Sequence, residues 1–453
     1  MADKVRSEDT HRDTHTLTHA QTRTHAHTHT HSTHTHTHIH THATNACWRP
    51  RTMMQAPYCD SPSPLRLDAG CSCSGPPGVT CLGLRLALPK APMTPVLPIA
   101  ERSIPKIRIV TECSGLEPLP YVLDRLGLAG RYKMVAACEV DPLCRRVIRL
   151  CHTGDARPRQ LFKDIARRRP EQLPDHDLYV AGFPCQPFST MGSRLVVDDP
   201  SGRGLIIEHI IAALAAKTPR AFLLENVKGL VTQHRGTFDH ILHQLRTMAG
   251  SAYLVAHKII DTADHGLPQH RERVYILGFL RSSFVRSARF KWPRPRPRRS
   301  LQHVLRWTST DKRKVIVKER KFIHRASPKL QQRLKAVLAG IRQKGVDPRD
   351  LNCPVVADID GSKPHWMRGI SPCLTRARAA TGHYLPARGR RLTIKERLRL
   401  QGLPVHIHKR CRGHISDRQL GAMIGNSLSL NVLQALLSRM LPACGLVPRA
   451  PGF

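Results

Sequence analysis

Short apolar runs alternate with amphipathic segments through the middle of the chain. Runs that predict buried strands stand at residues 107–110, 134–138, 178–180, 222–224 and 274–279. Between them, apolar residues recur with helical spacing at residues 119–126, 205–216 and 238–248, and a further helix is expected from about Pro142. This alternation predicts an α/β fold with a parallel sheet that is covered by helices on both faces.

The pattern changes after Phe279. Residues 292–297 read Trp-Pro-Arg-Pro-Arg-Pro, which excludes a regular helix or a central strand. The stretch that follows, to about residue 390, is basic and poorly periodic, and helical spacing returns at residues 394–400 and 428–437. We expect a large domain at residues 104–285, a small domain at 286–417, a C-terminal helix at 418–441 that returns to the large domain, and a tail at 442–453.

The N-terminal region has the composition of a chain without a core. Residues 1–45 contain a long alternation of His and Thr, which predicts a disordered low-complexity tail, and residues 46–103 are rich in Pro, Cys and Gly and are expected to be a linker. Five of the 14 cysteines stand between residues 47 and 81, but they include no Cys-x-x-Cys pair. We therefore predict free thiols and no metal site.

The formal net charge of +39 indicates a polyanionic partner. The first 45 residues do not cause it, because they contain four basic and four acidic side chains besides histidine. Residues 281–350 contain 22 Lys and Arg against four Asp and Glu, a net of +18. We expect this stretch to face nucleic acid. No apolar run approaches the roughly 18 residues that a bilayer requires, so no membrane partner is predicted.

Several groups suited to chemistry follow predicted strands, where ligands bind in parallel sheets. Glu139 follows the second strand, and a carboxylate there can accept both hydroxyls of a ribose. Asp164 follows a further apolar segment, and Glu225 and Asn226 follow residues 222–224. Cys185 stands between two prolines after residues 178–181, in a stiff loop that presents its thiol to solvent or substrate.

Sequence motifs around these residues resemble those of the DNA cytosine-5 methyltransferase family and occur in its order. They are Gly-Phe-Pro-Cys-Gln-Pro-Phe-Ser at residues 182–189, Arg-Gly at 203–204, Glu-Asn-Val at 225–227, Gln-His-Arg-Glu-Arg at 269–273, Ser-Pro-Cys-Leu-Thr at 371–375, the segment 391–404 beginning Arg-Leu-Thr, and Gly-Asn-Ser at 425–427. The resemblance covers residues 105 to 440. It implies a Rossmann-like fold dependent on S-adenosylmethionine, with a small, basic target-recognition domain.

The resemblance also implies a covalent route to methylated cytosine in DNA. The Cys185 thiolate attacks C6 of the ring, which makes C5 nucleophilic enough to accept a methyl group. Free cysteine has a pKa of ~8.5, so this thiol needs cationic or dipolar help at neutral pH. Glu225 is expected to hold N3 and the exocyclic amine with support from Asn226, while Arg271 and Arg273 contact the flipped nucleotide and its phosphate. The base must leave the duplex, because its C5 is unreachable inside it.

Ten residues are implied to bind S-adenosylmethionine. They are Cys113, Ser114, Gly115, Leu116, Glu139, Val140, Asp164, Ile165, Pro184 and Asn426. The loop after the first strand departs from the family pattern, which is an acidic residue, an aromatic residue and Gly-x-Gly-Gly. Residues 111–118 read Thr-Glu-Cys-Ser-Gly-Leu-Glu-Pro, so only one glycine is kept and Glu117 adds a negative charge. Cofactor binding is therefore expected with an altered loop. The segment 391–404 is expected to be architectural.

Two alternatives stay open at this stage. One branch of the family methylates tRNA, and its Cys-Phe-Thr element is not found before residue 391. The other alternative is a nucleic-acid-binding regulator that has lost turnover through the altered cofactor loop. Retention of Cys185, Glu225, Arg271 and Arg273 in register favours the DNA enzyme. We expect a monomer located in the nucleus, with basic segments at 294–299 and 312–314 as import signals.

Overall fold

The computed structural model describes residues 105–184, 206–285, 289–305, 312–361 and 363–448. All of them belong to one of the two units into which the chain divides, Pro95–Phe453. The expected nucleophile Cys185 and the Arg203-Gly204 motif lie outside the described residues, as does the N-terminal region predicted to be a tail and a linker.

The large sheet has seven strands in the order β3-β2-β1-β4-β5-β7-β6. They are β1 (Ile107–Glu112), β2 (Tyr132–Cys138), β3 (Gln160–Phe162), β4 (Leu178–Gly182), β5 (Ala221–Val227), β6 (Tyr253–Asp261) and β7 (Glu272–Leu280). The strands from β3 to β5 are parallel, whereas β7 runs antiparallel to both β5 and β6. The parallel core confirms the predicted fold class, and the antiparallel β6–β7 pair was not foreseen.

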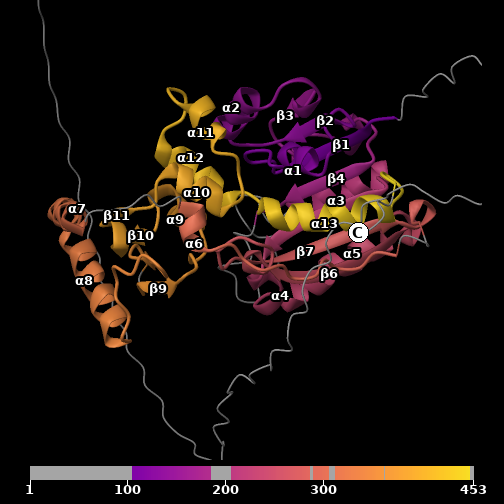
Figure 1. Ribbon diagram of the computed structural model, residues 1–453. Coiled ribbons are helices and arrows are strands. Elements are labelled where there is room, and N and C mark those ends of the chain that lie inside the picture. The colour runs from indigo at the N-terminus through magenta and orange to yellow at the C-terminus, as the bar shows by residue number, and fades with distance from the viewer. Residues whose placement is uncertain (1–104, 185–205, 286–288, 306–311, 362, 449–453) are drawn as a thin grey trace, which may run out of the picture. The chain divides into compact units, whose positions relative to one another are not determined.

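Helices cover both faces of this sheet, because successive strand residues point to opposite sides. On β4, Leu178 and Val180 belong to one apolar cluster, and Tyr179 and Ala181 belong to the other. The first cluster includes α1 (Leu119–Arg125), α2 (Pro142–Cys151) and α13 (Leu430–Ala443), and the second includes α3 (Ile206–Lys217), α4 (Gly229–Thr232) and α5 (Arg235–Ser251). Figure 1 shows α13 running beside α1.

The pairing of β5 with β7 depends on a glycine. Gly278 stands opposite Phe222, and a Cβ at position 278 would lie 1.9 Å from the Phe222 ring. A larger residue would push β7 away from β5. This close approach brings the polar ends of the two strands together.

A second sheet, in the order β11-β10-β8-β9, is antiparallel throughout. Its strands are β8 (Val355–Asp358), β9 (His365–Arg368), β10 (Tyr384–Leu385) and β11 (Arg390–Arg391). The helices of this part of the chain are α6 (Leu301–Leu305), α7 (Lys312–Arg325), α8 (Pro328–Gln343), α9 (Arg376–Thr381) and α10 (Ile394–Leu400), whereas α11 (His406–Cys411) packs against α2. Leu334, Val337 and Ile341 of α8 pack against Val355 and Ala357 in a separate core. The expectation of poor periodicity was thus wrong for α7 and α8.

The stretch Asp417–Ala443 has the length and apolar composition of a membrane-crossing helix. It consists of two helices, α12 (Asp417–Asn426) and α13, which are separated by residues 427–429. Leu433 and Leu437 of α13 are fully buried in the first apolar cluster. The stretch is therefore a core element of the fold.

Candidate active site

The carboxyl ends of the parallel strands bring most of the predicted site residues to one edge of the sheet. Glu112 at the end of β1 pairs with Cys138 of β2 and Ala181 of β4, and Gly182 pairs with Glu225 of β5. The loops that follow these strands therefore start side by side, as expected for a ligand site in such a sheet.

The loop after β1 is bonded to the end of β2. The Ser114 N–H and hydroxyl both donate to the Cys138 carbonyl, and the Gly115 N–H donates to Glu139 Oε2 at 2.7 Å. Cys113 and Gly115 have φ values of 52° and 55°, a conformation that glycine adopts easily and cysteine rarely. Leu116 is buried, and its carbonyl contacts the His152 ring.

Glu139 and Val140 form a polar and an apolar part of the same edge. The Glu139 carboxylate is buried, which raises its pKa, although hydrogen bonds from the Asp141 and Gly115 N–H groups oppose that rise. Val140 is 71% exposed, which is unusual for a valine next to buried residues. A buried carboxylate beside an open apolar side chain suits a ribose and a base.

A buried ion pair that was not predicted connects the loop after β3 to the sheet. Arg168 donates to the Glu112 carboxylate, which also accepts from the Tyr179 hydroxyl, and all three side chains are buried. Within this loop, Asp164 Oδ1 accepts from the Ala166 N–H at 3.0 Å, and Ile165 is buried. The pair therefore fixes Asp164 and Ile165 relative to the loop after β1.

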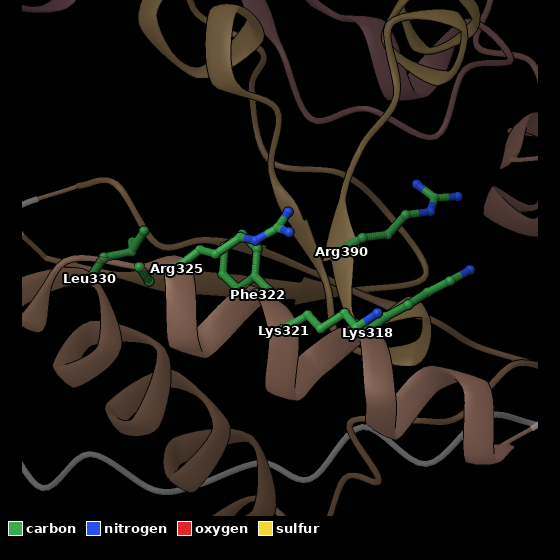
Figure 2. Close-up of a pocket in the computed structure, with 8 residues that line it drawn as sticks. Lys318, Lys321, Phe322, Arg325, Leu330 and Arg390 are labelled. Carbon is green, nitrogen blue, oxygen red and sulfur yellow. The ribbon is translucent and has the colours of Figure 1, made fainter.

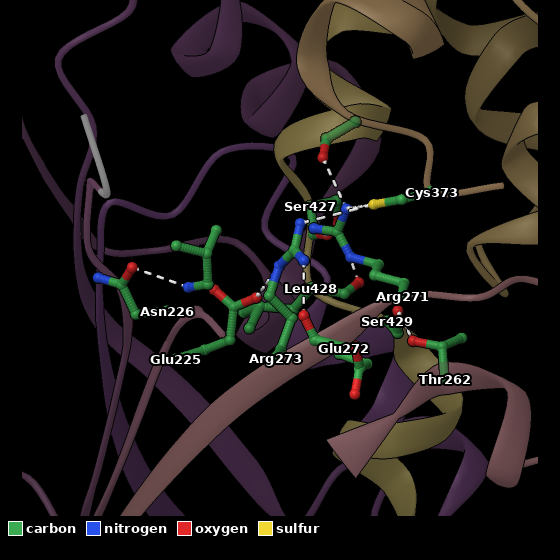
Figure 3. A network of polar contacts seen from close by, with 12 residues as sticks. Glu225, Asn226, Thr262, Arg271, Glu272, Arg273, Cys373, Ser427, Leu428 and Ser429 are labelled. Carbon is green, nitrogen blue, oxygen red and sulfur yellow. Dashed lines mark hydrogen bonds and ion pairs between the residues drawn. The ribbon is translucent and has the colours of Figure 1, made fainter. Parts of the chain in front are cut away.

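The second half of the site lies at the ends of β5 and β7, shown in Figure 3. Arg273 Nε lies 3.2 Å from Glu225 Oε1. Burial alone would lower the pKa of the Arg273 guanidinium, but the neighbouring Cys373 thiol and the Glu225 carboxylate keep it above its ordinary value. Asn226 Nδ2 donates to the Phe183 carbonyl at 3.3 Å, and Pro184, the last described residue before Cys185, is half-buried.

The Arg271 side chain is bonded inside the fold. Its guanidinium is buried and donates to the carbonyls of Leu374, Gly425 and Ser427 at 3.0 to 3.2 Å. These hydrogen bonds engage both terminal nitrogens of Arg271, whereas its Nε has no partner among the described residues, so its contact with the nucleotide stays a prediction. Arg271 thereby ties the start of β7 to the segment before α9 and to the end of α12.

Two further residues complete the surroundings of the arginines. Cys373 was not predicted as a site residue, yet its Sγ lies 3.7 Å from Arg271 Nη1 and 3.8 Å from Arg273 Nη2. Asn426, expected at the cofactor, is exposed at the end of α12, and within the described part of the chain its side chain has no hydrogen-bond partner. Its side chain is therefore available to a ligand.

The segment 391–404 has the architectural contacts that were expected of it. Thr393 and Glu396 cap α10 reciprocally, and Glu396 also pairs with Arg390. Gln269 Nε2 donates to the Leu400 carbonyl and to Gln401 Oε1, while Gln401 Nε2 donates to the Ser427 carbonyl. These buried bonds join the segment to the residues just before β7 and to the end of α12.

A family model described as C-5 cytosine-specific DNA methylase matches residues 108–441. The chain belongs to this family. It is 33% identical over 292 residues to the type II methyltransferase M.HaeII of Haemophilus aegyptius, covering 64% of this chain and 81% of that protein. It is 34% identical over 287 residues to M.NgoBI of Neisseria gonorrhoeae, covering 62% and 80%.

The fold is similar to that of a DNMT2 mutant from Spodoptera frugiperda, with a TM-score of 0.51 and 18% identity over 74% of this chain and 100% of that one. The fold and family predicted from sequence are therefore confirmed. As a DNA cytosine-5 methyltransferase, the protein transfers a methyl group from S-adenosylmethionine to C5 of cytosine.

A basic cavity lies apart from these catalytic motifs, at α7 and β11 of the methyltransferase. Its volume is about 330 Å³, and Figure 2 shows the side chains that line it: Lys318, Lys321, Phe322, Arg325, Leu330 and Arg390. Arg390 is neutralised by Glu396, but no described acidic residue pairs with Lys318, Lys321 or Arg325. The cavity therefore keeps a positive charge.

Proposed function

We propose that methyl transfer proceeds through a covalent bond between Cys185 Sγ and C6 of a cytosine rotated out of the duplex. The thiolate forms the S–C6 bond as a proton reaches N3, C5 takes the methyl group, and loss of the C5 proton then breaks the S–C6 bond. S-adenosylmethionine supplies the methyl group when it is bound beside Glu139 and Val140.

The Glu225–Arg273 ion pair is the observation that supports this route. Glu225 is buried, yet its Oε1 accepts no hydrogen bond of normal geometry, even though Arg273 lies 3.2 Å away. A buried oxygen without a donor is costly, so a cytosine amine or protonated N3 would stabilise it. The cationic Arg273 can in turn stabilise charge on the pyrimidine.

Asn226 fixes the backbone that precedes the expected nucleophile. Its bond to the Phe183 carbonyl holds the backbone that leads through Pro184 to residue 185. Holding a reacting group in place lowers the entropy lost on reaching the transition state.

The test is a trapping experiment with duplex DNA that contains 5-fluorocytosine, which cannot lose its C5 substituent as a proton. In the presence of S-adenosylmethionine, the parental protein should form a denaturation-resistant adduct and Cys185→Ala should form none. Cys353→Ala, at a half-buried cysteine, is the control and should be trapped normally. An adduct with Cys185→Ala would refute the assignment of the nucleophile.

The positive cavity at α7 supports a contact between the small, basic region and DNA phosphates. We also propose that the protein acts as a monomer, since one chain carries all the residues named in this route. We further propose that residues 294–299 and 312–314 direct it to the nucleus. Light scattering of the DNA complex tests the first, and imaging of a fluorescent fusion with and without those basic segments tests the second.

A further inference from the structure

Glu117 departs from the family pattern of the cofactor loop and contacts Thr111 at the end of β1. The family pattern Gly-x-Gly-Gly has a glycine where this chain, which reads Gly-Leu-Glu-Pro at residues 115–118, has Glu117. In the fold the two side chains meet, because the Thr111 hydroxyl donates to Glu117 Oε2. The carboxylate therefore lies against position 111, although it comes from the other end of the loop.

The position of Glu117 has two energetic costs, burial of its carboxylate and a strained backbone conformation. It is 1% exposed, and its φ of 52° is strained for a residue other than glycine. Its Oε1 is buried and meets no donor at hydrogen-bond geometry, although the Ser114 hydroxyl and the Leu119 N–H lie near the carboxylate. A buried carboxylate oxygen without a partner is a costly arrangement that a ligand can relieve.

The surroundings of Glu117 contain a second carboxylate and no positive charge among the described residues, so they favour binding of a cation. Its charged neighbour across the loop is Glu139, which also bonds the Gly115 N–H, and no described Lys, Arg or His forms an ion pair with Glu117. His152 contacts the Leu116 carbonyl, but burial lowers its pKa to about 4, so its ring is neutral. Two carboxylates thus border a loop that holds no positive charge of its own.

We propose that Glu117 binds the α-ammonium group of S-adenosylmethionine. An ammonium N–H donates to Oε1, which satisfies the buried oxygen and balances its charge. Thr111 is then a positioning residue that orients the carboxylate through Oε2.

A pair of ligands tests this assignment by calorimetry, without turnover. S-adenosylhomocysteine carries the ammonium group, whereas 5′-methylthioadenosine has the nucleoside half but no amino-acid half. Glu117→Gln should weaken S-adenosylhomocysteine binding by about tenfold, the effect of losing a charge-assisted hydrogen bond. It should leave 5′-methylthioadenosine binding unchanged within about twofold. Equal weakening for both ligands would mean a purely structural role, and no weakening for either would refute the contact.

A second variant moves the carboxylate to position 111, on the other side of the Thr111–Glu117 contact. Thr111→Asp combined with Glu117→Gly also removes the strained φ, so it should fold at least as well as the parent. It should recover the S-adenosylhomocysteine affinity that Glu117→Gln loses, to within about threefold of the parent. If it binds 5′-methylthioadenosine normally but S-adenosylhomocysteine as weakly as Glu117→Gln, a carboxylate at this place in the loop does not hold the ammonium group.

Discussion

Asn226 donates its side-chain N–H to the carbonyl of Phe183, and this bond joins the end of β5 to the backbone that leads to residue 185. Asn226→Ala should lower kcat by about 100-fold, the cost of a misplacement of about 1 Å, while the affinity for S-adenosylhomocysteine stays the same. Single-turnover methylation of DNA measures the first and calorimetry the second. Asn352→Ala, at an exposed position, is the control. If Asn226→Ala methylates DNA at an unchanged rate, the Asn226–Phe183 hydrogen bond does not contribute to catalysis.

Substitution of the two arginines of the 269–273 motif should have different effects, on stability for Arg271 and on kcat for Arg273. Arg271→Ala leaves three carbonyls without their donor and should reduce the free energy of unfolding by about 3 kcal/mol or more. Arg273→Ala should cost less stability but lower kcat by about 100-fold or more, because it removes the cation beside Glu225. Urea denaturation and single-turnover rates separate them. If Arg271→Ala is stable but inactive, Arg271 contacts the nucleotide and is not mainly a structural residue.

Removing one partner of the buried Glu112–Arg168 pair should lower the free energy of unfolding more than replacing both partners with apolar residues. Burial raises the pKa of Glu112 against the opposing effects of Arg168 and Tyr179, so Arg168→Met leaves an uncompensated acid. We expect a loss of about 3–5 kcal/mol for the single variant, and of only about 1–2 kcal/mol for Glu112→Leu with Arg168→Met. S-adenosylhomocysteine affinity should fall in the single variant, because the Asp164–Ile165 loop loses its anchor. A double variant as unstable as the single one would contradict this account.

Glu117 should make cofactor affinity depend on pH. Burial, with a contribution from Glu139, raises its pKa to about 7 against hydrogen bonds from Thr111 and Ser114. Below that pH the acid is neutral and cannot pair with an ammonium group. S-adenosylhomocysteine affinity should therefore rise between about pH 6 and pH 8, and Glu117→Gln should show no such rise. His152 is neutral throughout, and Glu139 is present in both proteins, which isolates Glu117.

The same raised pKa affects the stability of the ligand-free enzyme. Unfolded, Glu117 ionises near its ordinary 4.5, and folded only near 7, so between these values the unfolded chain binds fewer protons. The folded state therefore loses stability as pH rises through this window. At pH 8, Glu117→Gln should be more stable than the parent by roughly 2–3 kcal/mol in thermal or urea unfolding. Lower stability would contradict the raised pKa.

The basic cavity should contribute to the salt dependence of DNA binding. Lys318→Glu with Lys321→Glu should weaken binding and reduce the slope of log K against log salt by about 1.8, which corresponds to two lost phosphate contacts. Lys329→Glu with Lys335→Glu changes the charge equally at exposed positions of α8 outside the cavity. Equal effects of the two double variants would show a general charge effect and no contact at the cavity.

Sequence predicted the parts of this enzyme that depend on local patterns. Apolar runs gave the strands β1, β2, β4, β5 and β7, and strand-end acids such as Glu139 and Glu225 lie where parallel topology requires. The helix α8 was missed, although Ser327 and Pro328 are start signals and Leu334, Val337 and Ile341 have helical spacing. The density of basic residues concealed that pattern.

Contacts between distant residues could not be predicted in this way. Glu112 meets Arg168 and Tyr179 across 56 and 67 positions, and a hydrophobicity pattern contains no information on such pairs. Arg271 matched a motif correctly in type, but its direction follows from the carbonyls of Gly425 and Ser427, more than 150 positions away. The predicted roles of Cys185 and the ten cofactor residues stay predictions.

The Arg271 bonds have a consequence for synthesis of the protein. Two of the three carbonyls that hold this strand end belong to residues 425 and 427, and α13 beyond them completes the apolar cluster under β1 and β4. Until residues 425–443 have been synthesised, Arg273 and Glu225 lack the support that aligns them. A nascent or prematurely terminated chain can therefore contain the motifs up to residue 273 and still be unable to modify DNA.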